Sequence, residues 1–419
     1  MNTRSGGASD KKVSPHAHLF VLASMLIDSI GFGIIIPVVP ELILEVSGRP
    51  LAEATRIGGL LLLVFALMQF FCGPLVGNLS DRFGRRPVLL LSMFCFGLDY
   101  LAMALAPTLA WLFVGRALAG AAGAIFVPAN AFLADVTPPE KRAQAFGMLG
   151  AAFGLGFIIG PAIGGALGQF GTRAPFYAAA ALALVNLVYG YFVLPESLPP
   201  ERRRAFEWKR ANPLGSLLTL RKYPGVLGVA AALLLWQIAH QVYPSTWAFF
   251  AIARFDWSPA MIGATLAYSG VFMALTQALL TGRIVAKVGE KKAAYLGFAF
   301  GILAYVGYAF AGREWIFFAI MTFGALQSLA YPSLNALMSQ RVAKEEQGEL
   351  QGAVGSLYGL ASIAGPLLMS QTLAHFTEEG APFRFPGAAF LLAAALALLG
   401  AAIFSSSLRG GEGAGKSAS

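Results

Sequence analysis

Long apolar stretches, each about 20 residues long and separated by short polar segments, dominate the pattern along this 419-residue chain. A helix needs about 20 apolar residues, at ~1.5 Å each, to cross the roughly 30 Å hydrocarbon core of a bilayer. The pattern therefore predicts an all-α membrane protein with twelve transmembrane helices. The predicted spans are residues 18–40, 57–80, 87–107, 109–133, 143–167, 174–194, 225–252, 260–283, 292–311, 314–340, 347–375 and 385–406.

One long polar interruption, residues 195–224, divides these spans into two sets of six. It is basic and contains prolines, so we expect it to lie along the cytoplasmic membrane surface. The predicted organisation is a cytoplasmic N-terminal segment over 1–17, a six-helix bundle over 18–194, the linker over 195–224, a second six-helix bundle over 225–406 and a cytoplasmic tail over 407–419.

A repeated spacing of 205 residues indicates that the two bundles are copies of one unit. It relates Gly77 to Gly282, Gly84 to Gly289, Gly147 to Gly352, and the Gly160-Pro161 pair to Gly365-Pro366. Matches in three separate places at one spacing are strong evidence for a tandem repeat. Parallel halves with a central site between them are a recurring transporter architecture.

Composition and charge support a membrane location. Only 12% of the residues are charged, about half the share expected for a soluble protein of this size. The net charge is +9, and with both termini placed in the cytoplasm 23 of the 30 Lys and Arg residues fall on that side. The basic charge therefore predicts topology and attraction to anionic lipid, and no nucleic-acid partner. We expect the first span to be retained, since it contains Asp28 and lacks a cleavage site.

The segment from Gly77 to Arg86 reads GNLSDRFGRR and resembles the signature loop of the major facilitator superfamily. Its glycines permit a tight turn and close helix packing. The resemblance implies that superfamily's fold, with two pseudo-symmetric six-helix halves, and a cytoplasmic gate that latches the halves. The alternative is that the arginines merely fix topology. The predicted gate residues are Gly77, Asp81, Arg82, Gly84, Arg85 and Asp135.

Span 5 carries a second motif, which is similar to the one associated with the antiporters of that superfamily. Small residues let helices pack closely, and a proline frees a backbone carbonyl. The resemblance favours export, although ordinary small-residue packing explains the pattern as well. The motif residues are Gly156, Gly160, Pro161, Gly164 and Gly165.

Three ionisable residues, Asp28, Asp99 and Arg116, lie within spans of the N-terminal half. Each costs roughly 2.5–3.5 kcal/mol at mid-span on insertion scales, so we expect a function for them. Burial favours the protonated form of a carboxyl group, whereas a nearby arginine favours the ionised form. A proton-coupling site requires this opposition. The alternative is a static Asp–Arg pair that holds helices together.

A narrower resemblance, to the tetracycline efflux proteins and related drug–proton antiporters, runs over nearly the whole chain. It rests on Leu26 to Gly33 in span 1, Leu98 to Tyr100 in span 3, Gly115-Arg116 in span 4, and Trp257 to Gly263 before span 8. It implies that Asp28, Asp99 and Arg116 are the functional membrane-embedded charges.

The chain departs from that family at one position. The tetracycline exporters carry an acid in span 9, where this chain has Gly301. Within the chain itself, the residue that the 205-residue repeat matches with Asp81 is Ala286 rather than an acid. Either Asp28 and Asp99 carry proton coupling alone, or His240 takes part, or the solute is not a metal–tetracycline complex.

Polar and aromatic residues within the spans predict a solute cavity between the halves. Pro244 can break span 7, and irregular backbone at membrane depth is tolerated where it lines protein or a cavity. For any single residue, hydrogen bonding between helices is the more common role, and it is the set as a whole that favours a cavity. The predicted cavity residues are Gln69, Gln237, His240, Gln241, Tyr243, Trp247, Gln327, Tyr331 and Asn335.

The combined prediction is a secondary active transporter that exports a small amphiphilic, drug-like solute in exchange for protons. We expect a monomer in the bacterial inner membrane, driven by the proton gradient without a cofactor or metal. Cys72 and Cys95 lie within spans, and no nucleophile–base set indicates an enzyme. The alternatives are a metabolite facilitator or proton symporter of the same fold, and a non-transporting membrane sensor.

Overall fold

The computed structural model describes residues 17–123, 126–207, 215, 217–218 and 220–416, and the regular elements in those ranges are all helical. The first group of helices is α1 (Ala17–Ile35), α2 (Val39–Ser47), α3 (Leu51–Phe83), α4 (Arg85–Leu105), α5 (Leu109–Ala122), α6 (Phe126–Val136), α7 (Arg142–Gly168) and α8 (Ala174–Val193), with the short 3₁₀ turns η1 (Pro139–Lys141) and η2 (Pro200–Arg202).

The second group begins with the 3₁₀ turn η4 (Leu220–Lys222). It continues with α10 (Pro224–His240), α11 (Val242–Phe255), α12 (Pro259–Leu275), the π-helical η5 (Thr276–Thr281), α13 (Gly282–Phe310), α14 (Glu314–Gly324), the 3₁₀ turn η6 (Ala325–Leu329), α15 (Ala330–Ser339), the 3₁₀ turn η7 (Lys344–Glu346), α16 (Gln347–His375) and α17 (Ala388–Lys416).

Within the described residues, these helices account for the twelve predicted spans. Ten continuous helical runs are long and apolar enough to cross a membrane, and the bent pair α1–α2 forms one more. The run Pro259–Phe310 has 52 residues, far more than a bilayer core requires, and its backbone leaves the helical region at Gly289. It therefore contains two spans.

The first span differs from its prediction of 18–40. Here α1 ends at Ile35 and α2 extends to Ser47 at an angle of 49° to it. Pro37 lacks an N–H group and disfavours helical backbone at the residue before it, which explains the break. Span 7 is interrupted at Gln241, three residues before Pro244, because the proline cannot donate to the carbonyl of His240.

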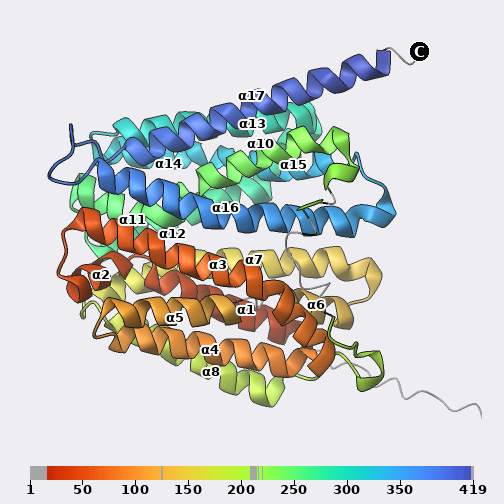
Figure 1. The fold of residues 1–419 in the computed structure, drawn as a ribbon, viewed down its shortest axis with the longest axis horizontal. Helices are drawn as coiled ribbons and strands as arrows, with labels where there is room; N and C mark the ends of the chain where they lie inside the picture. The colour runs from red at the N-terminus through yellow and green to blue at the C-terminus, as the bar shows by residue number, and fades with distance from the viewer. Residues whose placement is uncertain (1–16, 124–125, 208–214, 216, 219, 417–419) are drawn as a thin grey trace, which may run out of the picture.

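The helices form two bundles that lie side by side (Figure 1), α1 to α8 in one and α10 to α17 in the other. Helix α3 contacts α16, and α7 contacts α12, across the boundary between the bundles. Gly84 and Gly289, related by the 205-residue repeat, share an unusual backbone, with φ of 106° and 79° and ψ of 160° at both. This agreement supports the tandem repeat predicted from the sequence.

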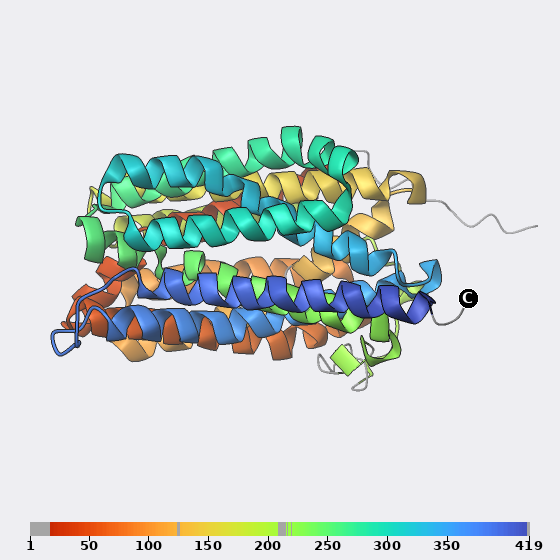
Figure 2. The same cartoon turned by 90° about the horizontal axis from the view of Figure 1, so that it is seen from above.

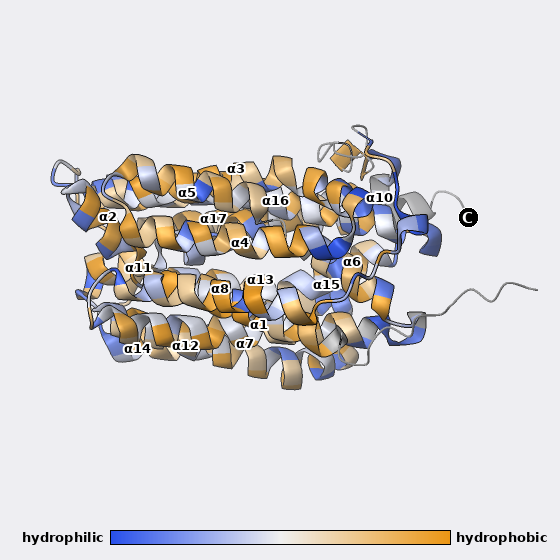
Figure 3. Cartoon of the chain, turned by 90° about the horizontal axis from the view of Figure 1, so that it is seen from below, coloured by the Kyte–Doolittle hydropathy of each residue, from blue (hydrophilic) through white to orange (hydrophobic). Residues whose placement is uncertain are grey.

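Hydrophilic residues gather at the two ends of the bundles, with hydrophobic residues along the helices between (Figure 3). We call the end that holds residues 77–86 and 196–207 the signature-loop end, and the end that holds α2 and residues 376–387 the far end. The turned view in Figure 2 shows these ends at opposite extremes of the long axis.

The two bundles are packed together at the far end. A β-carbon on Gly59 of α3 would lie 3.1 Å from the carbonyl oxygen of Pro366 of α16. One on Gly165 of α7 would lie 2.5 Å from the carbonyl oxygen of Pro259 of α12. Arg56 of α3 also forms an ion pair with Glu378, which follows α16.

The same helices are apart at the signature-loop end. A β-carbon on Gly147, Gly150 or Gly154 of α7 would meet no other atom within 4 Å. The equivalent space beside α16 is also open, at Gly348, Gly352 and Gly355. In Figure 1, α3 and α16 diverge toward this end. The structure is thus open at the signature-loop end and closed at the far end.

Candidate transport site and gate

Asp28 lies on α1 in the middle of the N-terminal bundle, beside α8. The amide nitrogen Nδ2 of Asn186 donates a hydrogen bond of 3.0 Å to Asp28 Oδ1. The same nitrogen is 3.3 Å from the carbonyl oxygen of Ser24. The other oxygen, Asp28 Oδ2, is inaccessible to solvent and has no hydrogen-bond partner among the described residues. Asp28 is therefore an acid whose direct side-chain partner is neutral.

Asp99 and Arg116 form an ion pair between α4 and α5. The pair joins Arg116 Nη2 to Asp99 Oδ2, and both side chains are almost fully buried, at 0% and 7% exposure. Gly115 leaves room for this contact, because a β-carbon there would lie 2.9 Å from Asp99 Oδ1. The guanidinium group also stands 5.6 Å from the centre of the Phe65 ring. The arginine thus neutralises Asp99 and does not contact Asp28.

Two of the predicted polar residues of the C-terminal half, His240 and Gln327, lie against Tyr243. Gln327 Nε2 donates to the Tyr243 hydroxyl at 2.9 Å. The His240 ring lies 5.1 Å from the Tyr243 ring, and His240 Nδ1 is inaccessible and without a hydrogen-bond partner in the described part of the chain. Gln241 faces the other way and donates to Ser362 of α16 at 2.7 Å. These contacts join spans 7, 10 and 11.

Trp247, also predicted as a cavity residue, adjoins this cluster, with its ring centre 5.8 Å from that of Tyr243. Its side chain is buried at 2% exposure and packs against Tyr308 and Phe317. Its indole N–H donates to Thr265 Oγ1 at 3.1 Å. The sequence could not separate a cavity-facing indole from one in an aromatic core.

The remaining predicted cavity residues are dispersed. Gln69 donates to the carbonyl oxygen of Gly123, within the N-terminal bundle, at 3.1 Å. Gln237 is half-buried on α10. Tyr331 is 41% exposed, and Asn335 exchanges hydrogen bonds with Gln351 nearer the signature-loop end.

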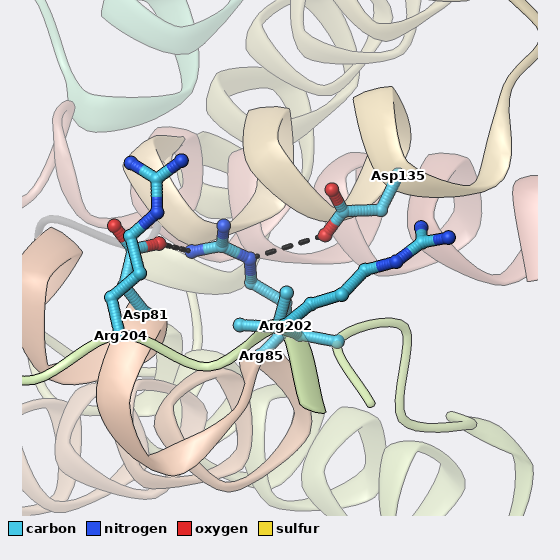
Figure 4. Close-up of a pocket in the computed structure, with 6 residues that line it drawn as sticks. Asp81, Arg85, Asp135, Arg202 and Arg204 are labelled. Carbon is cyan, nitrogen blue, oxygen red and sulfur yellow. Dashed lines mark hydrogen bonds and ion pairs between the residues drawn. The ribbon is translucent and has the colours of Figure 1, made fainter. Parts of the chain in front are cut away.

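The signature loop forms a charged cluster centred on Arg85 (Figure 4). Arg85 Nη1 lies 2.6 Å from Asp81 Oδ1, and Arg85 Nε lies 3.2 Å from Asp135 Oδ2. Arg82, also predicted to belong to the gate, is exposed and stacks over Phe83. A cavity of about 470 Å³ beside the cluster is lined by Asp81, Arg85, Asp135, Leu198, Arg202 and Arg204.

The gate glycines have separate structural roles. A β-carbon on Gly77 would lie 3.0 Å from Val127, so this glycine allows α3 to pack against α6. Gly84 has φ of 106°, a conformation that side chains with a β-carbon rarely adopt, and it separates α3 from α4.

The span 5 motif is a helix-packing surface. On one face, β-carbons on Gly156 and Gly160 would lie 2.9 Å and 2.6 Å from carbonyl oxygens of α1, and Gly164 is closer still to Ile34. On another face, Gly165 packs on α12, whose Gly263 in turn contacts the carbonyl oxygen of Pro161. The motif therefore places α7 between α1, which carries Asp28, and the C-terminal bundle.

Sequence reasoning missed Asn186 and Glu196. Asn186 carried a signal, since it is a polar residue in the middle of span 6. Glu196 carried none, because its partners are the backbone N–H groups of Arg85 and Arg86, 111 and 110 residues away.

Comparison with known proteins identifies the family. The profile of the Major Facilitator Superfamily matches residues 21–366. The chain belongs to this superfamily. It is 40% identical to the class C tetracycline resistance protein of Escherichia coli, over 92% of this chain and 96% of that protein. The class B protein of Escherichia coli is 36% identical over 84% and 88% of the two chains, and multidrug resistance protein 2 of Bacillus subtilis is 30% identical over 85% and 89%.

Solved structures of this superfamily share the fold. A bacterial homologue of the human lysosomal transporter Spinster aligns with a TM-score of 0.77 at 16% identity, over 96% of this chain and 98% of that one. The human organic anion transporter MFSD10 aligns with a TM-score of 0.68 at 24% identity, over 93% and 99%. Superfamily membership confirms a multi-pass membrane transporter of small molecules rather than an enzyme, and the sensor alternative is set aside.

Proposed function

We propose that this protein is a proton-driven exporter of a small amphiphilic, drug-like solute, working by alternating access. One observation carries the proposal: the two bundles are packed at the far end and apart at the signature-loop end, through the same two helix pairs. The glycines of α7 and α16 at the signature-loop end provide the surfaces on which α7 packs against α12, and α16 against α3, when that end closes. Rocking the bundles about the centre exchanges one closed end for the other.

The charge distribution orients the transporter. Most Lys and Arg residues belong to the loops of the signature-loop end and to the linker, which supports a cytoplasmic location for this end and for both termini. The conformation described here is then open to the cytoplasm, as an exporter must be when it loads its solute. Relatives of bacterial origin support a location in the bacterial inner membrane. A monomer suffices, with the proton gradient as the energy source and no cofactor.

Asp28 is the better candidate for the proton site. A proton that binds or leaves Asp28 breaks no ion pair, because its partner is the neutral Asn186. Protonating Asp99 would instead leave the charge of Arg116 buried and unpaired, which is costly at membrane depth. We therefore assign proton exchange to Asp28 and helix positioning to the Asp99–Arg116 pair.

The solute site is assigned to the centre of the molecule, between Asp28 of α1 and the Tyr243 cluster. The cluster offers aromatic faces, amide groups and the neutral or charged ring of His240, which suit a planar amphiphile. Tetracycline is the first solute to test, because several relatives are tetracycline resistance proteins.

A second candidate function is export or facilitated passage of a different solute. It is favoured by Gly301, which occupies the position where the tetracycline exporters carry an acid. A carrier without that acid could pass a neutral metabolite, with Asp28 only hydrogen-bonding the solute.

The experiment is solute flux with purified protein in liposomes, with and without an imposed pH gradient. We expect a tetracycline or another amphiphilic drug to be driven against its concentration gradient by protons moving in the opposite direction. Flux that ignores the pH gradient would support the facilitator instead. No flux of any tested drug, with saturable flux of a metabolite, would reject the drug-exporter proposal.

A further inference from the structure

The first turn of α4 is capped by an acid from the interdomain linker. The first N–H groups of a helix have no partner within the helix and need an acceptor from elsewhere. Here Glu196 Oε1 accepts from the backbone N–H of Arg85 at 2.8 Å, and Oε2 accepts from that of Arg86 at 3.3 Å. A carboxylate at this position also suits the positive end of the helix dipole. Glu196 therefore caps the helix that carries the central arginine of the gate.

Gly84 makes this contact possible. The Glu196 carboxylate occupies the space beside the Gly84 α-carbon, where a β-carbon would lie 2.8 Å from Glu196 Cδ. The same glycine has φ of 106°. Its lack of a side chain thus serves both the turn between α3 and α4 and the entry of the carboxylate.

The rest of the linker start is fastened to the same loop. The backbone N–H of Arg204 donates to the carbonyl oxygen of Asp81 at 3.1 Å. Asn78 Nδ2 donates to the carbonyl oxygen of Glu207 at 2.7 Å. Ser197 Oγ donates to Asp135 Oδ2 at 3.1 Å. Figure 4 shows the linker, with Arg202 and Arg204, running past Asp81 and Arg85.

We propose that Glu196 is a positioning residue of the gate. By fixing the first turn of α4, it holds the Arg85 side chain between Asp81 and Asp135. By anchoring the linker start, it makes residues 196–207 part of the N-terminal bundle. The proposal rests on the alternating-access function above and adds a linker residue to its gate.

The test compares Glu196→Ala and Glu196→Gln with Glu201→Ala and Glu201→Gln. Glu201 is an exposed acid five residues along the same linker, without a hydrogen bond or ion pair in the described part of the chain, so each control removes the same charge. Spin labels at Met148 of α7 and Leu280 of η5, both exposed at the signature-loop end, report the separation of the halves. Cys72 and Cys95 are replaced beforehand.

We expect Glu196→Ala to shift the label distances toward the open conformation and to lower kcat about tenfold, the effect of ~1.4 kcal/mol on one equilibrium. Glu196→Gln retains one acceptor oxygen and should give an intermediate shift, whereas both Glu201 variants behave as wild type. A cap that merely stabilises the fold would reduce the amount of folded protein and leave the distances of the folded fraction unchanged. If Glu196→Ala does not fold, Glu196→Gln decides.

Unchanged distances and kcat in Glu196→Gln, alongside a transporting wild type, would overturn the positioning role. A distance shift in the Glu196 variants of a protein whose wild type moves no solute with protons would instead reject the proposed function and keep the positioning role. The two failures are therefore distinguishable.

Discussion

The indole ring of Trp236 lies against the α-carbon of Gly301. A β-carbon on Gly301 would be 2.8 Å from Trp236 Cζ3 and 3.6 Å from Gln327 Cβ, and the tryptophan is buried at 2% exposure. Trp236 in turn stacks on His240 at 6.3 Å between ring centres. The Trp236 ring thus fills the space beside Gly301, the position that the resemblance to the tetracycline exporters matches with an acid, and it also packs on His240.

Restoring the acid should therefore fail. We expect Gly301→Asp to lower stability by about 1–3 kcal/mol, because the added atoms overpack against the Trp236 ring. Thermal unfolding of the purified protein measures the loss. In a Trp236→Ala background the same substitution should cost less, since the ring is gone. Equal costs in both backgrounds would show that Trp236 is not what excludes a side chain there.

The Asp99–Arg116 pair should behave as one unit. Asp99→Asn and Arg116→Gln are each expected to cost about 3–5 kcal/mol, because each leaves a buried charge without its partner. The double variant should lose less than the sum of the two. Asp28→Asn, whose partner Asn186 is neutral, serves as the matched control and should cost much less. A stable Asp99→Asn would contradict the ion pair described here.

The ion pair at the far end should hold that end closed over the ordinary pH range. The hydrogen bond from Arg56 lowers the pKa of the Glu378 carboxyl below its ordinary value of 4.5. His375 Nδ1 lies 3.4 Å from Glu378 Oε1. Because the carboxyl pKa is lowered, the stabilisation that the ion pair provides is complete when the pH is above the ordinary pKa. This stabilisation is lost as the pH falls through the lowered pKa. We expect the far end to stay closed from pH 8 to pH 5 and to open only in stronger acid.

Glu378→Gln should remove this dependence and open the far end at neutral pH. Labels at Phe170 and Gly380, exposed on the two sides of that end, report the opening. Glu379→Gln is the matched control. Glu379 is the exposed acid next to Glu378, and it has no ion pair among the described residues. A Glu378→Gln protein with wild-type distances at every pH would rule out the latch.

The open glycine face of α7 should matter for turnover and not for folding. Gly147→Leu adds a side chain where no atom lies within 4 Å, so we expect a wild-type melting temperature. It should nevertheless slow transport by tenfold or more, because the added side chain keeps α7 from packing on α12 and η5. Gly352→Leu, its repeat equivalent on α16, should behave alike.

Gly165→Leu provides the contrast on the same helix. Its side chain would meet the carbonyl oxygen of Pro259, so it should destabilise the folded protein. Wild-type transport by Gly147→Leu would contradict the idea that this face packs in the other conformation.

The sequence predicted the helices and the repeat because both rest on strong local signals. Runs of apolar residues set the spans, and Gly84 and Gly289 adopt the same backbone 205 residues apart. It also indicated which charges are embedded. It could not pair them: the partnership of Asp99 with Arg116, and of Asp28 with Asn186, depends on which faces of α1, α4, α5 and α8 meet. Likewise, only packing shows that Trp236 fills the space beside Gly301 and that Trp247 lies among aromatic rings.

The Asp28→Asn variant tests the central claim most directly. In liposomes, the wild type should accumulate solute under an imposed pH gradient and should also exchange labelled for unlabelled solute at equal pH. Asp28→Asn is predicted to lose gradient-driven accumulation and to keep exchange, since the halves still alternate but no proton is carried. Gradient-driven accumulation at the wild-type rate by Asp28→Asn would contradict the account.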